Sequence, residues 1–133
     1  MEFLGKKAAS APIKSATAQQ KGQAAEALAL AHLQAAGLRL LARNYRTPGR
    51  GGGDVDLIVR DRDGTLVFVE VRSRSRRDFG GAGASINTAK QRRIILAARH
   101  YLMRLSTPPP CRFDAVLIDG DQLEWVRAAF NAS

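Results

Sequence analysis

The stretch from Gly53 to Arg72 reads GDVDLIVRDRDGTLVFVEVR. Two apolar runs flank the polar segment 61–64, a pattern that predicts two antiparallel strands joined by a tight turn. Each run carries one acid among its apolar residues, Asp56 in the first and Glu70 in the second. A carboxylate that is buried without a partner is very costly. The two acids of this hairpin therefore need an explanation.

The turn sets the register of the two strands. A three-residue loop at residues 62–64 places its glycine at the left-handed position that such loops require. Counting outward from this loop, Asp56 faces Glu70. One step further Asp54 faces Arg72, and since side chains alternate between the two faces of a sheet, these four share one face. The other face is expected to carry Val55, Leu57, Val59, Val67, Val69 and Val71. A two-residue loop would instead place the two acids on opposite faces.

Opposed carboxylates whose Cβ atoms lie about 4.5–5.5 Å apart repel each other. A shared Mg²⁺ or Mn²⁺ between Asp56 and Glu70 would turn this repulsion into coordination, because hard divalent cations take oxygen ligands. The alternative that stays open is a structural cluster in which Arg72 and other arginines neutralise the acids. A third acid, Glu26, lies on an apolar face of the predicted first helix. Gln91 is its counterpart on the second helix, and we expect both to point toward the same face of the sheet.

The size of the chain, 133 residues, fits one domain with one core. We expect residues 1–18 to form a flexible tail and residues 19–133 to form the domain. The apolar share of 45% is that of an ordinary globular protein, and no apolar run approaches the ~20 residues of a membrane helix. The single cysteine, Cys111, excludes an internal disulfide and a cysteine-rich zinc site, and it favours a cytoplasmic location.

Positive charge dominates the composition, with 21 Lys and Arg against 12 Asp and Glu and a net charge of +9. The basic residues gather after the second strand of the hairpin and at the start of the second helix. They are Arg72, Arg74, Arg76, Arg77, Lys90, Arg92 and Arg93. Such clusters indicate a polyanionic partner, with nucleic acid as the first choice. A solvated basic surface and an acidic protein partner are the alternatives, and no amphipathic segment indicates a membrane surface.

The periodicity of the remaining sequence predicts helices at 17–36 and 88–105, with strands at 38–46, 54–61, 65–72, 112–119 and 122–127. Capping boxes are expected at Thr17 with Gln20 and at Thr88 with Gln91. The apolar surface of the first helix is expected to comprise Leu28, Leu30, Ala31, Leu33 and Ala35. In the last strands Asp114 is expected to pair with an arginine. The order αβββαββ predicts an α/β fold, a mixed sheet flanked by helices.

Several separated motifs, covering about residues 19–120, closely resemble the bacterial YraN-like uncharacterised protein family. They are Gly22-x-x-Ala25-Glu26, Asn44-x-Arg46, the segments 53–58 and 68–74, Lys90-Gln91-Arg92-Arg93 and Arg112-Phe113-Asp114. That family looks like a branch of the PD-(D/E)xK nuclease superfamily, close to archaeal Holliday-junction resolvases. The resemblance implies a restriction-endonuclease-like αβββαβ core, here with an extra C-terminal strand.

The resemblance also implies an activity, a metal-dependent endonuclease acting on DNA, including branched or otherwise structured DNA. By position, Asp56 and Glu70 are the metal-binding acids for Mg²⁺ or Mn²⁺. Glu26 takes the place of the acid on the first helix, where it would bind the ion directly or through water. Lys90 would supply an amine to the catalytic site, and Gln91 stands where some relatives place polar residues. Resolvase-like relatives suggest a homodimer.

One departure from the superfamily pattern keeps a second function open. The usual lysine of the motif is Arg72 here, which retains the charge but does not readily act as a base because its pKa is above ~12. The alternative is a non-catalytic nucleic-acid-binding module of the same fold.

Overall fold

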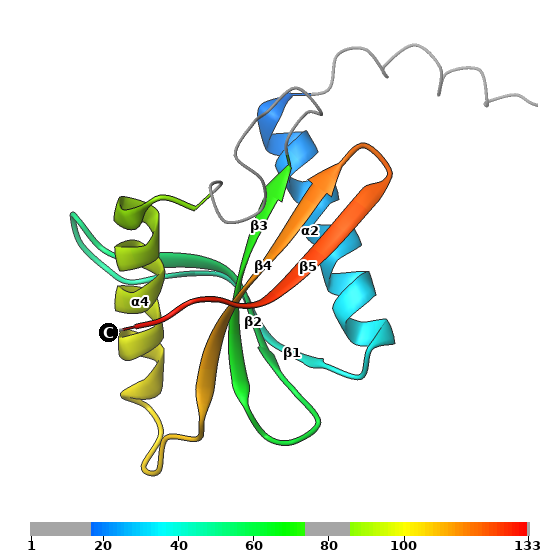
Figure 1. Cartoon of the computed structure of the whole chain (residues 1–133). Coiled ribbons are helices and arrows are strands. Elements are labelled where there is room, and N and C mark those ends of the chain that lie inside the picture. Colours follow the sequence, from blue (N-terminus) through cyan, green and yellow to red (C-terminus); the bar gives the residue numbers. More distant parts are fainter. Residues whose placement is uncertain (1–16, 74–85, 133) are drawn as a thin grey trace, which may run out of the picture.

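The protein is described by a computed structural model that covers residues 17–73 and 86–132. The elements are α2 (Ala18–Ala35), β1 (Arg39–Arg46), β2 (Asp54–Arg60), β3 (Leu66–Ser73), α4 (Thr88–Leu102), β4 (Cys111–Asp119) and β5 (Gln122–Phe130). The strands form one sheet in the order β1-β2-β3-β4-β5, and only β3 and β4 pair in parallel (Figure 1). The predicted α/β class, order and mixed sheet are confirmed. The tail expected at the N-terminus falls, up to residue 16, outside the described residues.

The two helices cover opposite faces of the sheet (Figure 1). Under α2 lie Ala25, Ala29, Leu30, Leu33, Leu38, Leu57, Val59, Val67, Val69, Val116 and Ile118. Under α4 lie Val55, Ile58, Leu66, Phe68, Ile86, Ile94, Ala97, Ala98, Tyr101, Phe113, Ala115 and Leu117. The expectation that Glu26 and Gln91 point toward one face is therefore wrong. The parallel β3–β4 connection needs a crossover, which carries α4 to the face opposite α2. Neither of these described helices has the length and apolarity to cross a membrane.

The start of α2 follows the prediction closely. Thr17 and Gln20 form the expected capping box, since each side chain accepts a hydrogen bond from the backbone N–H of the other. The apolar face differs from the prediction, because Leu28 is 54% exposed whereas Ala25 and Ala29 are buried. Ala25, Ala29 and Leu33 follow the i, i+4 row of the helix, and the small residues in this row let α2 lie close to the sheet.

The start of α4 is displaced by one residue from the prediction. Asn87, rather than Thr88, is the N-cap, and its side chain accepts a hydrogen bond from the Lys90 backbone N–H at 2.8 Å. The Gln91 carboxamide donates to the Ile86 carbonyl at 3.0 Å instead of completing a capping box. Asn is at least as good an N-cap as Thr, so the local sequence offered two competing starts. The helix ends at Leu102, three residues before the predicted end.

The central hairpin has the predicted three-residue loop. Gly64 has φ +92°, and Asp61 and Thr65 close the loop with a backbone hydrogen bond of 2.9 Å. Ile58 pairs with Phe68, so the expected register holds. The paired residues run from Arg60 and Leu66 to Leu57 and Val69, and the ladder stops there.

Beyond this point β2 and β3 separate. The Val71 N–H donates to the Asp56 carboxylate at 2.8 Å, rather than to a backbone carbonyl of β2. Val55 instead pairs with Tyr45 of β1 and packs on the α4 side. The prediction that Val55 shares a face with Leu57 is therefore wrong, because the alternation set by pairing with β3 does not continue past Leu57, where β2 leaves β3.

Gly53 lies where the chain leading into β2 touches α4 without room for a side chain. An added Cβ would lie 2.3 Å from the Arg93 carbonyl oxygen and 2.5 Å from the Ala97 nitrogen. Because both atoms are backbone, Gly53→Ala must push β2 and α4 apart, and we expect a loss of about 2–3 kcal/mol in the free energy of unfolding. Gly22→Ala is the matched control. Nothing lies within 4 Å of its added Cβ on α2, so it should stabilise by about 0.5–1 kcal/mol. Urea unfolding of both variants measures the difference, and equal effects would contradict the close contact.

Candidate functional site

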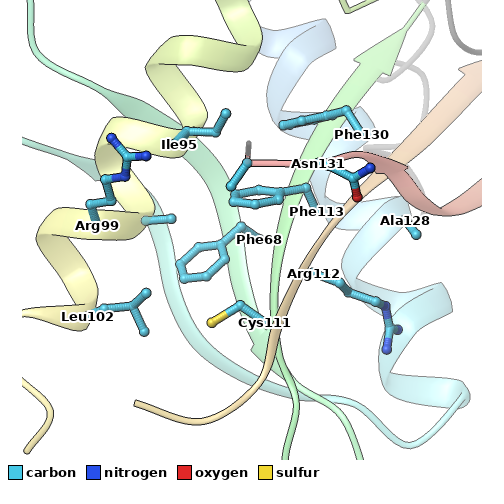
Figure 2. A pocket seen from close by; sticks show the side chains of 12 residues that line it. Phe68, Ile95, Arg99, Leu102, Cys111, Arg112, Phe113, Ala128, Phe130 and Asn131 are labelled. Atoms are coloured by element: carbon cyan, nitrogen blue, oxygen red, sulfur yellow. The ribbon is translucent and has the colours of Figure 1, made fainter. Parts of the chain in front are cut away.

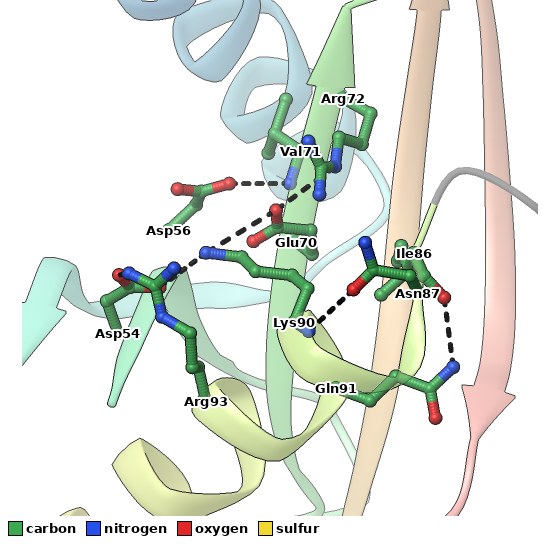
Figure 3. Close-up of polar contacts among 10 residues, drawn as sticks. All are labelled: Asp54, Asp56, Glu70, Val71, Arg72, Ile86, Asn87, Lys90, Gln91 and Arg93. Atoms are coloured by element: carbon green, nitrogen blue, oxygen red, sulfur yellow. Dashed lines mark hydrogen bonds and ion pairs between the residues drawn. The ribbon is translucent and has the colours of Figure 1, made fainter. Parts of the chain in front are cut away.

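The two acids of the hairpin meet where β2 and β3 separate (Figure 3). Asp56 is half-buried, whereas Glu70 is only 3% exposed. The Glu70 Oε1 atom has no hydrogen-bond partner among the described residues. Its Oε2 atom lies 3.3 Å from Arg72 Nε and 3.8 Å from Lys90 Nζ. Buried polar atoms nearly always have partners, so this orphaned carboxylate oxygen marks a candidate functional site.

The protonation of Glu70 reflects this environment. Its burial, and next the negative charge of the adjacent Asp56, raise the pKa of Glu70 to about 8 against the opposing charges of Lys90 and Arg72. The surrounding cations thus do not compensate for the two acids. If the acids and the neighbouring cations formed a structural cluster without a further ion, Glu70 would stay largely protonated at neutral pH. An additional cation at the acid pair would favour ionisation.

Lys90 connects α4 to the acid pair. Its ammonium forms a hydrogen bond with Asp54, and Arg93 forms an ion pair with the other Asp54 oxygen (Figure 3). Burial raises the pKa of Asp54, but the hydrogen bond and charge of Lys90, followed by those of Arg93, outweigh it and hold that pKa below its usual value. The expected facing of Asp54 and Arg72 is not found, because the ladder opens before this position and Asp54 turns to α4.

Glu26 approaches the site from α2 on the other side of the sheet. Its burial, and next the charge of Asp56, raise the pKa of Glu26, while a hydrogen bond from Asn44 opposes this rise. Asp56 is therefore close enough to both Glu26 and Glu70 for its charge to act on them. In the ranges 17–73 and 86–132, however, no three His, Cys, Asp or Glu side chains come together in a way that would hold a metal ion. The described residues thus place two carboxylates, Asp56 and Glu70, at the fork where β2 and β3 separate, with Glu26 nearby.

The other predicted site residues are distributed unevenly. Gln91 donates to the Ile86 carbonyl and points away from the acids (Figure 3). Arg92 and Arg93 are exposed on the first turns of α4, and Arg72 is half-buried beside Glu70. Arg74, Arg76 and Arg77 lie outside the described residues.

Asp114 provides a contrast with Glu70, since both acids are buried. Asp114 is fully buried, and it accepts hydrogen bonds from Arg112 at 3.0 Å, from the Trp125 indole at 2.9 Å and from the Ala128 backbone at 3.0 Å. The expected pairing with an arginine is confirmed. Because every acceptor direction has a donor, Asp114 is explained by its structural role, joining β4 to β5. Glu70 has no comparable set of donors among the described residues.

One apolar cavity is separate from the acids. It has a volume of about 310 Å³ and lies between α4 and the end of β5 (Figure 2). Phe68, Leu102, Phe113 and Phe130 are among its lining residues, and none of the acids discussed above is. Cys111 lies at this cavity, and partial burial raises the pKa of its thiol, which lowers the fraction of reactive thiolate. The acid pair therefore remains the candidate site.

The fold and the site define a class: a mixed α/β protein whose sheet opens around a buried acid pair beside a lysine, consistent with an α+β nuclease-like core. Residues 25–118 match the profile of the uncharacterised protein family UPF0102. The chain belongs to this family, the YraN-like family of the predicted resemblance.

Relatives match nearly the whole chain. A UPF0102 protein of Paracidovorax citrulli is 71% identical over 119 residues, covering 90% of this chain and 88% of the relative. A UPF0102 protein of an Acidovorax species is 66% identical over 134 residues, covering all of both chains. A third, from Verminephrobacter eiseniae, is 63% identical over 140 residues, covering 99% of this chain and 97% of the relative.

Proposed function

We propose that this protein is a metal-dependent endonuclease that acts on DNA. The observation that supports the proposal best is the buried Glu70, which has an oxygen without a hydrogen-bond partner among the described residues and a second acid, Asp56, beside it. Structural acids such as Asp114 have a donor for each acceptor position, so an unpaired oxygen of this kind favours binding of a cation.

A divalent cation suits this pair of acids. Mg²⁺ commonly keeps several waters and binds through one or two carboxylates plus the substrate phosphate, so a set of three protein ligands is not required. Asp56 and Glu70 would hold the ion, with Glu26 acting directly or through water. When bound, the ion would polarise the scissile phosphate and lower the pKa of a water molecule.

The chain's own cations would complete the site. Lys90 and Arg72 lie next to Glu70, where they would stabilise negative charge that develops on the phosphate. Asp54 holds the Lys90 ammonium in position through its hydrogen bond. Arg92 and Arg93 would bind flanking phosphates, which fixes the position of a strand without reading its sequence. A cytoplasmic location and a homodimer with two such sites belong to the same proposal.

The second candidate function is a nucleic-acid-binding module without catalysis. Arg72 in place of the motif lysine favours it, because arginine does not serve as a base. This alternative expects binding whose affinity falls steeply with salt and no cleavage that depends on a metal.

A cleavage assay separates the two functions. Labelled duplex, flap and four-way-junction DNA would be incubated with the protein in Mg²⁺, in Mn²⁺ or in EDTA. The proposal expects products that require the metal and are lost with Asp56→Ala. Identical background for the wild type and Asp56→Ala on every substrate, together with binding of the DNA, would favour the non-catalytic module.

A further inference from the structure

The loop between β1 and β2 is closed and ordered by hydrogen bonds across its base. The Thr47 N–H donates to the Gly53 carbonyl at 3.0 Å, and the Gly53 N–H donates to the Thr47 hydroxyl at 2.7 Å. Gly49 and Gly51 have φ +88° and +65°, conformations that side chains disfavour. We call residues 47–53 the glycine loop. These hydrogen bonds and glycine conformations fix the shape of the loop.

The glycine loop lines an open cavity at the surface. The cavity has a volume of about 500 Å³, and its lining includes backbone from the loop together with Arg46, Asp54 and Arg93. The N–H groups of Gly49 and Gly51 have no backbone acceptor within the described part of the chain. Glycine loops that present free N–H groups form concave sites for anions.

The charge at this cavity is positive. Arg46 is exposed and forms no ion pair with any residue in the ranges 17–73 and 86–132. Asp54 is the acid that lines the cavity, and it is neutralised by Lys90 and Arg93. Arg93 is 54% exposed, so its remaining donors are accessible. The cavity therefore combines the backbone of the glycine loop with two accessible guanidinium groups.

We infer that the glycine loop, with Arg46 and Arg93, binds a backbone phosphate of the nucleic-acid strand that reaches the acid pair. The inference rests on the proposed function. Asp54 lines the cavity and stands two residues before Asp56 on β2, a rise of about 7 Å along the strand. A strand with one phosphate at the acid pair would thus have a neighbouring phosphate within reach of the loop. Arginine suits this role because its planar donors engage phosphate oxygens in pairs.

The test measures binding in EDTA, where no cleavage takes place. Fluorescence anisotropy of a labelled duplex and a labelled single strand would be recorded from 50 to 300 mM salt. Arg46→Ala should weaken binding about tenfold near 0.1 M salt and lower the salt slope by about one. Arg39→Ala is the matched control, because it removes the same charge from the opposite end of β1. It should change the affinity less than twofold.

A second variant tests the loop without changing charge. Thr47→Val removes the hydroxyl that accepts from Gly53. It should weaken binding severalfold with an unchanged salt slope, while the thermal unfolding midpoint shows that the protein remains folded. Equal effects of Arg46→Ala and Arg39→Ala, or no DNA binding by the wild type, would overturn the inference. Displacement of the DNA by 1 mM inorganic phosphate would also overturn it, since the loop would then be a site for free phosphate.

The outcome is separable from that of the cleavage assay. If the loop variants weaken binding but the wild type never cuts DNA, the phosphate site stands and the endonuclease proposal fails. If the wild type cuts DNA and the loop variants bind as well as the control, the endonuclease proposal stands and the phosphate site fails.

Discussion

Glu70→Gln is expected to raise the free energy of unfolding of the metal-free protein at pH 8 by on the order of 3 kcal/mol. The substitution keeps the shape of the side chain but removes a charge that is buried beside Asp56. Replacing a buried acid that has its own hydrogen-bond partners normally destabilises the fold. Here the wild-type acid carries a desolvation cost, so its neutral isostere should relieve it.

The raised pKa of Glu70 also determines how the free energy of unfolding changes with pH. The folded protein retains the Glu70 proton up to a pKa of about 8, whereas the unfolded chain releases it near 4.5. Between these values the folded state binds more protons, so wild-type stability should fall as the pH rises through this window. Urea unfolding in EDTA at pH 5, 6.5 and 8 measures the slope. The gap between Glu70→Gln and the wild type should widen toward pH 8, whereas Glu124→Gln, an exposed site on β5, should follow the wild type. Parallel curves for Glu70→Gln and the wild type would contradict the buried-acid account.

Asp56→Asn is expected to lower the rate of Mn²⁺-dependent DNA cleavage by about 10³-fold or more. The asparagine oxygen can still accept the Val71 N–H, so the fork between β2 and β3 should persist. What is lost is the carboxylate charge that, with Glu70, would hold the divalent cation. The measurement is the single-turnover rate on the best substrate of the cleavage assay.

The matched control for this prediction is Asp121→Asn. Asp121 is exposed in the turn between β4 and β5, so the same chemical change there should leave the rate within twofold. A rate for Asp56→Asn equal to that of the control would exclude this acid from the reaction.

The hairpin register could be predicted because it depends on local chemistry. Gly64 supplies the left-handed residue that a three-residue loop needs, and pairing then follows residue by residue. The end of the ladder could not be predicted in this way. It depends on the Asp56 side chain accepting the Val71 N–H, a competition between side chain and backbone that the alternating pattern does not reveal.

The sequence predicts the acids of the candidate site, but the partners that it predicts for them are partly wrong. Asp54 pairs with Lys90 and Arg93, which lie 36 and 39 residues away on α4, rather than with Arg72. This pairing depends on how closely α4 approaches the chain at Gly53, a contact that the sequence shows only as one glycine among several. Asp114 and Glu70 both lie within apolar strands of the sequence, so the sequence does not distinguish them. They differ in the donors that the tertiary structure brings to each carboxylate.

Calorimetric titration of the metal-free protein with Mn²⁺ at pH 8 measures whether Asp56 and Glu70 bind a divalent cation. The wild type should bind Mn²⁺ with release of a proton, seen as a heat that changes with the ionisation enthalpy of the buffer, because Glu70 must ionise to become a ligand. Glu70→Gln should remove both the binding and the proton release. Absence of Mn²⁺ binding by the wild type, or unchanged binding by Glu70→Gln, would contradict the account.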